Sequence, residues 1–247
     1  TDAATVPDTA TVPDTATDAG SPAGSIAIYV KGDHTPTSFS DGLSGQTASN
    51  FLIAISRYHI LTSATDSKPQ LCFDHGAKAV VCDMAGDTLV GACVTANVPS
   101  GPYTHGRTKV DWSSLTVKGN LHYGGQIIAG NFTFFRAFSD SQVDGKAYKA
   151  GDGSLRFQDL GGFVDQTVPF VYPPLPQMPG VKTETINGEF FMTFVWSKPL
   201  TIAQGNTEGH WARFHWQVFE GFRWQDLAIA GYKASIWDVA AAAAGTE

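Results

Sequence analysis

The sequence predicts an all-β fold, an antiparallel β-sandwich or jelly roll that follows an extended, low-complexity N-terminal tail. Three observations support this prediction. Apolar residues alternate with period two, as at Ile26, Ile28 and Val30. Glycine-rich turn signals such as Asn187-Gly188 separate the alternating stretches. A capped amphipathic helix is absent outside the Ala-rich C-terminal end.

The alternation and the turn signals together define the expected strands. They span 25–31, 50–61, 78–84, 88–95, 105–118, 126–138, 154–158, 166–172, 187–197 and 210–219. Short connections between so many strands favour antiparallel pairing in one domain over residues 25–239. Prolines 173, 174, 176 and 179 cannot lie inside a central strand, so residues 173–180 are the expected crossover between sheets or boundary between subdomains.

Residues 1–24 form a tail of different composition. Ala4–Thr9 repeats as Ala10–Thr15, followed by a decayed third copy at 16–18. Such a segment is too poor in apolar area to offset its ordering entropy, so we expect an extended spacer. Its threonines are candidates for O-glycans or for an added strand: Thr5, Thr9, Thr11, Thr15 and Thr17. The alternative is a strand donated to a neighbouring subunit's sheet edge, with Pro7 and Pro13 restricting where it pairs.

Charge and hydropathy exclude two classes of partner. The tail holds four Asp and no basic residue, so it supplies −4 of the net charge of −7. With only 16 Lys and Arg in 247 residues, binding to a phosphate backbone is not expected. No apolar run approaches the roughly 20 residues that a membrane helix needs. Numbering begins at Thr1 without a leader, which predicts a secreted or cell-surface protein whose signal peptide has been removed.

The cysteines and the Ala-rich C-terminal end each lead to one structural expectation. In an oxidising compartment, one pair of the three cysteines would form a disulfide. A tight turn at Gly86-Asp87 would place Cys82 diagonal to Cys93, so we predict that these two pair; three buried thiols are the alternative. The Ala-rich end, 240–247, would form at most a weak helix.

Catalytic, cofactor and metal motifs are mostly missing. The sequence lacks G-x-S-x-G, H-E-x-x-H, P-loop and G-x-G-x-x-G patterns, so no catalytic residue or cofactor is predicted. Three acidic residues in a Gly-rich region, Asp140, Asp144 and Asp152, are weak Ca²⁺ candidates. The ordered Asp-rich loop of known calcium sites is missing there, which favours solvated turns.

The C-terminal aromatic residues are the best candidates for binding. As a strand, 210–219 would place Ala212, Phe214, Trp216 and Val218 on the core face. The opposite face and the segment after it supply the predicted binding or interface residues, Trp211, Arg213, His215, Phe219 and Trp224. Planar rings beside hydrogen-bonding groups are typical of a sugar-stacking platform and equally of a subunit interface. The alternative is that another part of the chain covers these rings.

Several short motifs carry a family resemblance. They are Phe73-Asp74-His75-Gly76, Pro102-Tyr103-Thr104, His122-Tyr123-Gly124-Gly125, Gly221-Phe222-Arg223-Trp224-Gln225-Asp226, Gly231-Tyr232 and Trp237-Asp238. In this order they resemble uncharacterised bacterial lipoprotein-like, β-rich secreted surface proteins. The resemblance implies a secreted or lipid-anchored β domain behind a spacer, and it carries no activity over to any residue of this chain. This chain departs from that pattern because it has no N-terminal Cys to acylate.

Three functions follow as expectations. The first is an extracellular structural protein, a homo-oligomer or filament subunit, whose tail is ordered by neighbouring subunits or glycans. The second is a carbohydrate- or surface-binding module that uses the C-terminal aromatic residues. The third is a jelly-roll hydrolase or lyase.

Overall fold

The computed structural model describes residues 22–172, 175, 180–226, 231–232 and 236–240. Strands in the first part of the chain are β1 (Ser25–Asp33), β2 (Ser44–Gln46), β3 (Asn50–Leu61), β4 (Gln70–Asp74), β5 (Val80–Asp83), β6 (Asp87–Val94), β7 (Gly101–Tyr123) and β8 (Gln126–Ala137). They are followed by β9 (Ser141–Val143), β10 (Lys146–Tyr148), β11 (Gly153–Asp159), β12 (Asp165–Pro169), β13 (Val181–Ile186), β14 (Glu189–Ile202), β15 (His210–Gln217), β16 (Phe222–Trp224) and β17 (Asp238–Ala240). A short 3₁₀ turn covers Thr95–Asn97. The all-β prediction is confirmed.

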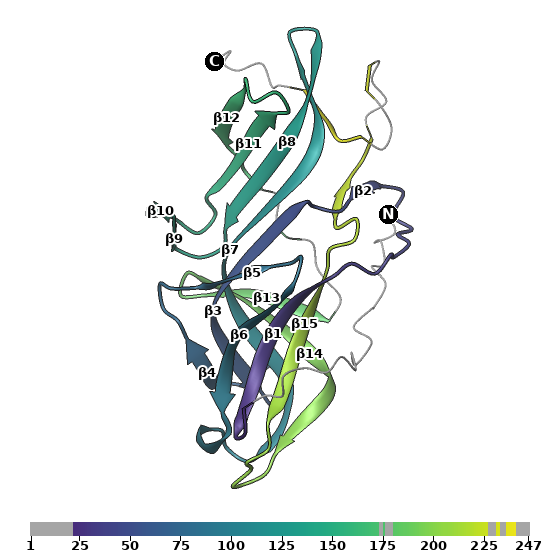
Figure 1. Cartoon of the computed structure of the whole chain (residues 1–247). Coiled ribbons are helices and arrows are strands. Elements are labelled where there is room, and N and C mark those ends of the chain that lie inside the picture. The colour runs from purple at the N-terminus through teal and green to yellow at the C-terminus, as the bar shows by residue number, and fades with distance from the viewer. Residues whose placement is uncertain (1–21, 173–174, 176–179, 227–230, 233–235, 241–247) are drawn as a thin grey trace.

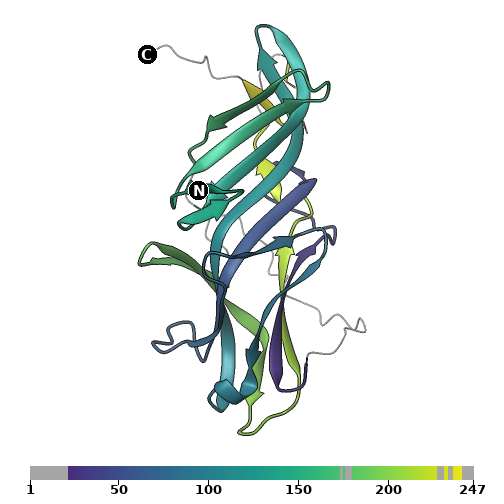
Figure 2. The same cartoon turned by 60° about the vertical axis from the view of Figure 1, so that its left-hand side comes forward.

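Strand β7 organises the molecule because its 23 residues run through both halves of it (Figures 1 and 2). Its first half pairs with β14, and its second half pairs with β8. Strand β3 pairs along the middle of β7 and continues the sheet to β4 and β5. We call the half around β14 and β3 the sandwich half and the half around β8, β11 and β12 the hairpin half.

The core of the sandwich half lies between two sheets. The three-stranded sheet β15-β1-β6 packs its apolar side chains against β3, β4, β5, β7 and β14. Ile28 of β1 and Ile53 of β3 are each 1% exposed. Complete burial of an aliphatic side chain stabilises the fold by about 1.5–3 kcal/mol, so this alternating pattern is what holds the two sheets together. The predicted inward set on β15 is confirmed, because Phe214 and Trp216 pack against this core.

The hairpin half has a separate aromatic core. Phe132 and Phe134 of β8 and Phe157 of β11 are buried. Trp237 packs onto them with ring centroids 4.7 Å from Phe132 and 5.3 Å from Phe134. The C-terminal segment is therefore part of this core, and β17 pairs in parallel with the end of β7.

The disulfide prediction is wrong in its pairing. Cys72 bonds to Cys93, and Cys82 is a buried free thiol. The expected hairpin does not form, because β5 pairs with β3 whereas β6 pairs with β1 in the other sheet. The turn at Gly86 therefore carries the chain between sheets and leaves Cys82 in the core. Cys93 meets Cys72 of β4, so the disulfide connects the two sheets of the sandwich.

Three terminal or connecting predictions fall largely outside the described residues. The tail is described only from Pro22, and the Ala-rich end only to Ala240. Of the expected crossover near 173–180, only 175 and 180 are described. The strands that flank it, β12 and β13, lie at opposite ends of the strand order β12-β11-β8-β7-β14-β13. Among the described residues, no helix is long and apolar enough to cross a membrane.

Candidate functional site

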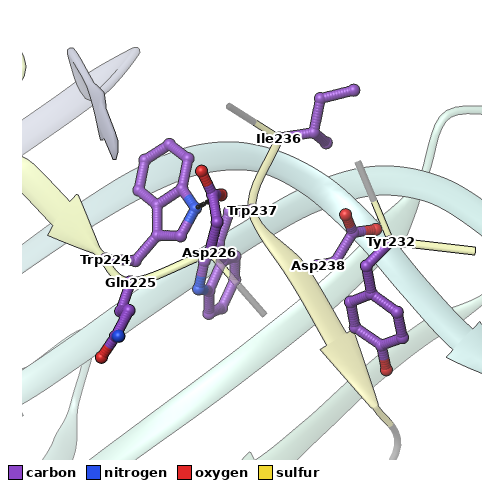
Figure 3. Close-up of a pocket in the computed structure, with 7 residues that line it drawn as sticks. All are labelled: Trp224, Gln225, Asp226, Tyr232, Ile236, Trp237 and Asp238. Atoms are coloured by element: carbon purple, nitrogen blue, oxygen red, sulfur yellow. Dashed lines mark hydrogen bonds between the residues drawn. The ribbon is translucent and has the colours of Figure 1, made fainter. Parts of the chain in front are cut away.

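A small pocket in the hairpin half gathers aromatic and polar side chains from the C-terminal segment (Figure 3). Its volume is about 130 Å³, room for several water molecules or one small ring. Its lining residues are Trp224, Gln225, Asp226, Tyr232, Ile236, Trp237 and Asp238. Figure 3 shows the Trp224 and Asp226 side chains beside Trp237, and the Asp238 and Tyr232 side chains to the right of them in that view.

Trp224 is placed by the two-stranded sheet β16-β2, in which it pairs with Ser44. The Trp224 indole N–H donates to Asp226 Oδ1 over 3.0 Å. The Ser44 hydroxyl donates to the other carboxylate oxygen of Asp226. The short sheet therefore fixes the indole and the carboxylate relative to each other before any ligand binds.

Trp237 reaches the pocket because the backbone beneath it carries no side chain. Gly119 of β7 lies so close that a Cβ atom there would be 2.5 Å from the Trp237 carbonyl oxygen. The Asn120 N–H donates to the same carbonyl over 2.9 Å. Residue 119 must therefore be glycine for steric reasons, since any side chain would push the Trp237 backbone away.

Tyr232 forms the third wall of the pocket, and its ring stacks on His122 behind it. The rings of His122 and Tyr232 lie parallel, with centroids 4.0 Å apart and an angle of 5° between their planes. Asp238 Oδ1 lies 2.7 Å from His122 Nε2. The Asp238 side chain is 4% exposed, so it serves chiefly to orient the imidazole on which Tyr232 rests.

The chemistry of the lining favours an uncharged or cationic polar ligand with one apolar face. The described lining residues include two carboxylates and one amide but no Lys or Arg. Indole and phenol rings offer flat apolar contact, and the carboxylates and Gln225 accept or donate hydrogen bonds at its edge. This combination is typical of ligand sites in which a few polar groups orient a ligand against apolar walls.

The predicted binding residues do not lie together in the structure, because they belong to different sheets. Trp211, Arg213 and His215 do lie together on the outer face of β15, as the alternation predicted. Arg213 forms an ion pair with Asp87 over 2.8 Å, and its guanidinium carbon lies 5.1 Å from the Trp211 ring. Phe219 follows β15 and is half-buried, and Trp224 belongs to the β16-β2 sheet. Alternation within one strand could not show that the two tryptophans lie in different sheets.

The weak calcium candidates form loop contacts. Asp140 Oδ2 lies 2.6 Å from the Lys149 ammonium, and Asp152 accepts the Lys149 backbone N–H over 2.6 Å. Asp144 occupies a turn with φ of 50°. Within the described ranges, no cluster of three or more His, Cys, Asp or Glu side chains has the arrangement of a metal site.

A second polar cluster lies on the sheet of the sandwich half. Arg57 contacts Asp74 over 2.7 Å and Glu189 over 2.6 Å. Lys109 lies 3.2 Å from both Asp111 and Glu189. These charges satisfy one another, so the cluster stabilises the pairing of β3, β7 and β14 and offers no open group to a ligand.

His59 lies next to this cluster on β3. Burial, together with the charges of two arginines beside it, lowers the pKa of His59 to about 4.

A second hollow of about 380 Å³ lies in the sandwich half, near Val181, Thr193 and Val195. The only ring among its lining residues is the imidazole of His105. It therefore lacks the indole and phenol walls that distinguish the Trp224 pocket.

The pocket residues Asp226, Tyr232, Trp237 and Asp238 were not predicted as a site. The available signal was the density of aromatic and acidic residues after position 220. The contact between His122 and Asp238 spans 116 positions, which no local pattern reveals. Comparisons with protein-family models, curated proteins and solved structures found no significant match.

Proposed function

We propose that this chain is an extracytoplasmic surface domain that binds carbohydrate in the pocket between Trp224 and Trp237. The observation that carries the proposal is the pocket itself, which combines an indole, a phenol and prearranged hydrogen-bonding groups. Sugar rings present an apolar face of C–H groups and a rim of hydroxyls, which this lining complements. The volume of about 130 Å³ suits one terminal sugar residue.

The disulfide supports the extracytoplasmic part of the proposal. Disulfides persist in secreted and cell-surface proteins and are rare in reducing compartments. The Cys72–Cys93 bond joins two sheets within the sandwich core, where it is structural. In this proposal the Thr-rich repeat connects the domain to a surface and carries the O-glycan candidates.

Binding is favoured over hydrolysis because both carboxylates of the pocket already have partners. Asp226 accepts hydrogen bonds from Ser44 and Trp224, and Asp238 contacts His122. A glycoside hydrolase needs one carboxyl free to protonate the leaving oxygen and a second to act on the opposite side. We therefore assign Asp226 to ligand orientation and Asp238 to holding the His122 ring in place.

Glycan-array retention tests the proposal with a matched tryptophan control. Trp224→Ala should lose retention, whereas Trp211→Ala should keep it because Trp211 lies on another sheet. Gln225→Ala, at an exposed residue of the pocket, should weaken retention without changing the melting temperature. Equal retention by all three variants would overturn the assignment, as would the absence of binding by the unaltered chain. Release of reducing ends from a retained glycan would instead support a hydrolase.

Self-assembly is the second candidate, and one observation favours it. Strand β15 pairs only with β1 among the described strands, so eight residues of backbone border the sheet at that edge. Uncovered edges of this length are templates for pairing with another chain. A rise in particle mass with concentration, measured by light scattering, would support assembly through this edge; a constant monomer mass would exclude it.

A further inference from the structure

Two turns of the hairpin half lie side by side at the same end of its sheet (Figures 1 and 2). The turn between β7 and β8 contains Gly124-Gly125, and the turn between β11 and β12 contains Gly161-Gly162. Strands β8 and β11 are neighbours in the sheet, and the Leu160 N–H donates to the Ala129 carbonyl of β8 over 3.2 Å. Both turns therefore project from the end of the hairpin half that points away from the sandwich half.

Each of these turns exposes large apolar side chains. At the β11–β12 turn, Phe163 is 93% exposed and Leu160 is 70% exposed. At the β7–β8 turn, Tyr123 is 64% exposed and Ile127 is 55% exposed. We call these four residues the apolar tip. A single exposed apolar residue is ordinary on a protein surface, but four on two adjacent turns form a patch that marks an interaction site.

The β11–β12 turn is fixed by its own side chains. The Asp159 carboxylate accepts the Gly161 N–H over 3.1 Å and the Val164 N–H over 2.6 Å. The Phe163 ring lies against Gly161, where a Cβ atom would be 2.7 Å from it. The exposed ring is thus held on an ordered turn, which reduces the entropy that binding through this ring would cost.

The exposed side chains of the β7–β8 turn lie on both faces of the hairpin. Tyr123 pairs with Gln126, whereas Ile127 pairs with His122. Paired residues share a face and successive residues alternate, so Tyr123 and Ile127 project to opposite faces. A flat protein surface would cover only one of these faces, whereas a lipid layer encloses both.

The area of the apolar tip also fits a lipid layer better than a protein partner. Its four side chains can bury at most about 600 Å², given the area that an aromatic side chain offers. A stable protein interface needs roughly 800 Å² from each partner. A lipid layer has no such minimum, because affinity for it grows with the apolar area that is inserted.

Charge around the apolar tip indicates which lipid it fits. Residues 119–130 and 157–170 contain no Lys or Arg, so this end of the molecule has no basic cluster to attract anionic headgroups. The adjoining Arg156 is bonded to Asp165, with Nε 2.7 Å from Oδ1. The phenol of Tyr123 suits the boundary between headgroups and acyl chains, where one end of the ring is apolar and the other is hydrated.

We propose that the apolar tip docks this domain onto a zwitterionic lipid bilayer by shallow insertion of the two turns. The four side chains enter the boundary between headgroups and acyl chains, to a depth of about 5–10 Å. Asp159 and the Arg156–Asp165 pair stay at the hydrated headgroup level and limit the depth. The chain lies on the bilayer in this arrangement and does not cross it. This inference does not depend on the carbohydrate pocket.

Flotation of the full chain with phosphatidylcholine vesicles tests the proposal. The unaltered chain should float with the vesicles, and Phe163→Ser should lower its partition coefficient by about tenfold. Phe163→Leu should retain most of the binding. The matched control is Val171→Ser, because Val171 is 91% exposed but follows the opposite end of β12. It should bind as the unaltered chain does, and the melting temperatures of all three variants should be unchanged because the substituted side chains are exposed.

Four results would contradict the proposal. The first is failure of the unaltered chain to float with the vesicles, and the second is an equal loss of binding in Phe163→Ser and Val171→Ser. The third is binding that appears only when anionic lipid is added, because it would assign the attraction to charge. The fourth is a lipid-free dimer that Phe163→Ser abolishes, because it would assign the apolar tip to a second copy of the chain.

Discussion

The disulfide gives the sharpest test of the sandwich. Removing it by Cys72→Ala should destabilise the folded state, because the bond closes a loop with a sequence separation of 21 residues. The loop-closure entropy for that length corresponds to about 3 kcal/mol at 25 °C. Because Cys93 and its neighbours remain buried in the core, the substitution removes the link between the sheets and little packing.

Urea unfolding and thiol titration measure this prediction together. The free energy of unfolding should fall by about 3 kcal/mol, and the slope against urea should rise because the denatured chain without the cross-link exposes more surface. Titrated in denaturant without reductant, the unaltered chain should show one thiol, Cys72→Ala two and Cys82→Ala none. In the folded protein, Cys82 should resist alkylation, since burial raises its pKa to about 12.

The opposite thiol pattern would refute the pairing. If Cys82 bonded to Cys93, Cys72→Ala would leave no thiol and Cys82→Ala would leave two. An unchanged free energy of unfolding in Cys72→Ala, with two thiols present, would refute the stabilising role of the bond while leaving the pairing intact.

Two further predictions concern the pocket and the polar cluster. Gly119→Ala places a methyl group 2.5 Å from the Trp237 carbonyl, so it should cost about 1–3 kcal/mol and abolish glycan retention; an unchanged melting temperature and retention would contradict this. His59 has its pKa lowered to about 4 in the folded state, so the unfolded chain binds the extra proton and stability falls as pH drops from about 6.5 to about 4. Between pH 7 and pH 5, the free energy of unfolding of His59→Gln should therefore fall by about 1 kcal/mol less than that of the unaltered chain, after allowance for partial exposure of the ring. If the free energies of unfolding measured in urea fell in parallel with pH in the two proteins, the prediction would be contradicted.

The sequence predicts long strands well, because burial on one face imposes alternation. Strand β3 has the predicted bounds, 50–61, and β15 shows the predicted inner and outer faces. The three-residue strands such as β16 and β17 escape prediction because they are too short to show a period. Strand β13 was not predicted, because it directly follows the proline cluster of residues 173–179. Its pairing with β14 is decided by tertiary contact.

The site was predictable only in part. Trp224 is among the predicted binding residues, but the sequence groups it with Trp211 because both lie in one aromatic-rich stretch. Which rings share a pocket depends on how the chain leaves β15 and returns to β7. The same limit explains the disulfide, since Cys72 and Cys93 meet only because β4 and β6 belong to facing sheets.

The length of β7 has a structural consequence. Tyr103 near its start lies in the same core as Ile26, where the chain enters from the tail, and Leu121 near its end pairs beside the pocket. A continuous strand over that interval spans about 60 Å and shares hydrogen bonds with both cores. Both cores are therefore built on one backbone, with β14 paired to the first half of β7 and β8 paired to the second half. The pocket is thereby linked through a single strand to the core in which β1 begins.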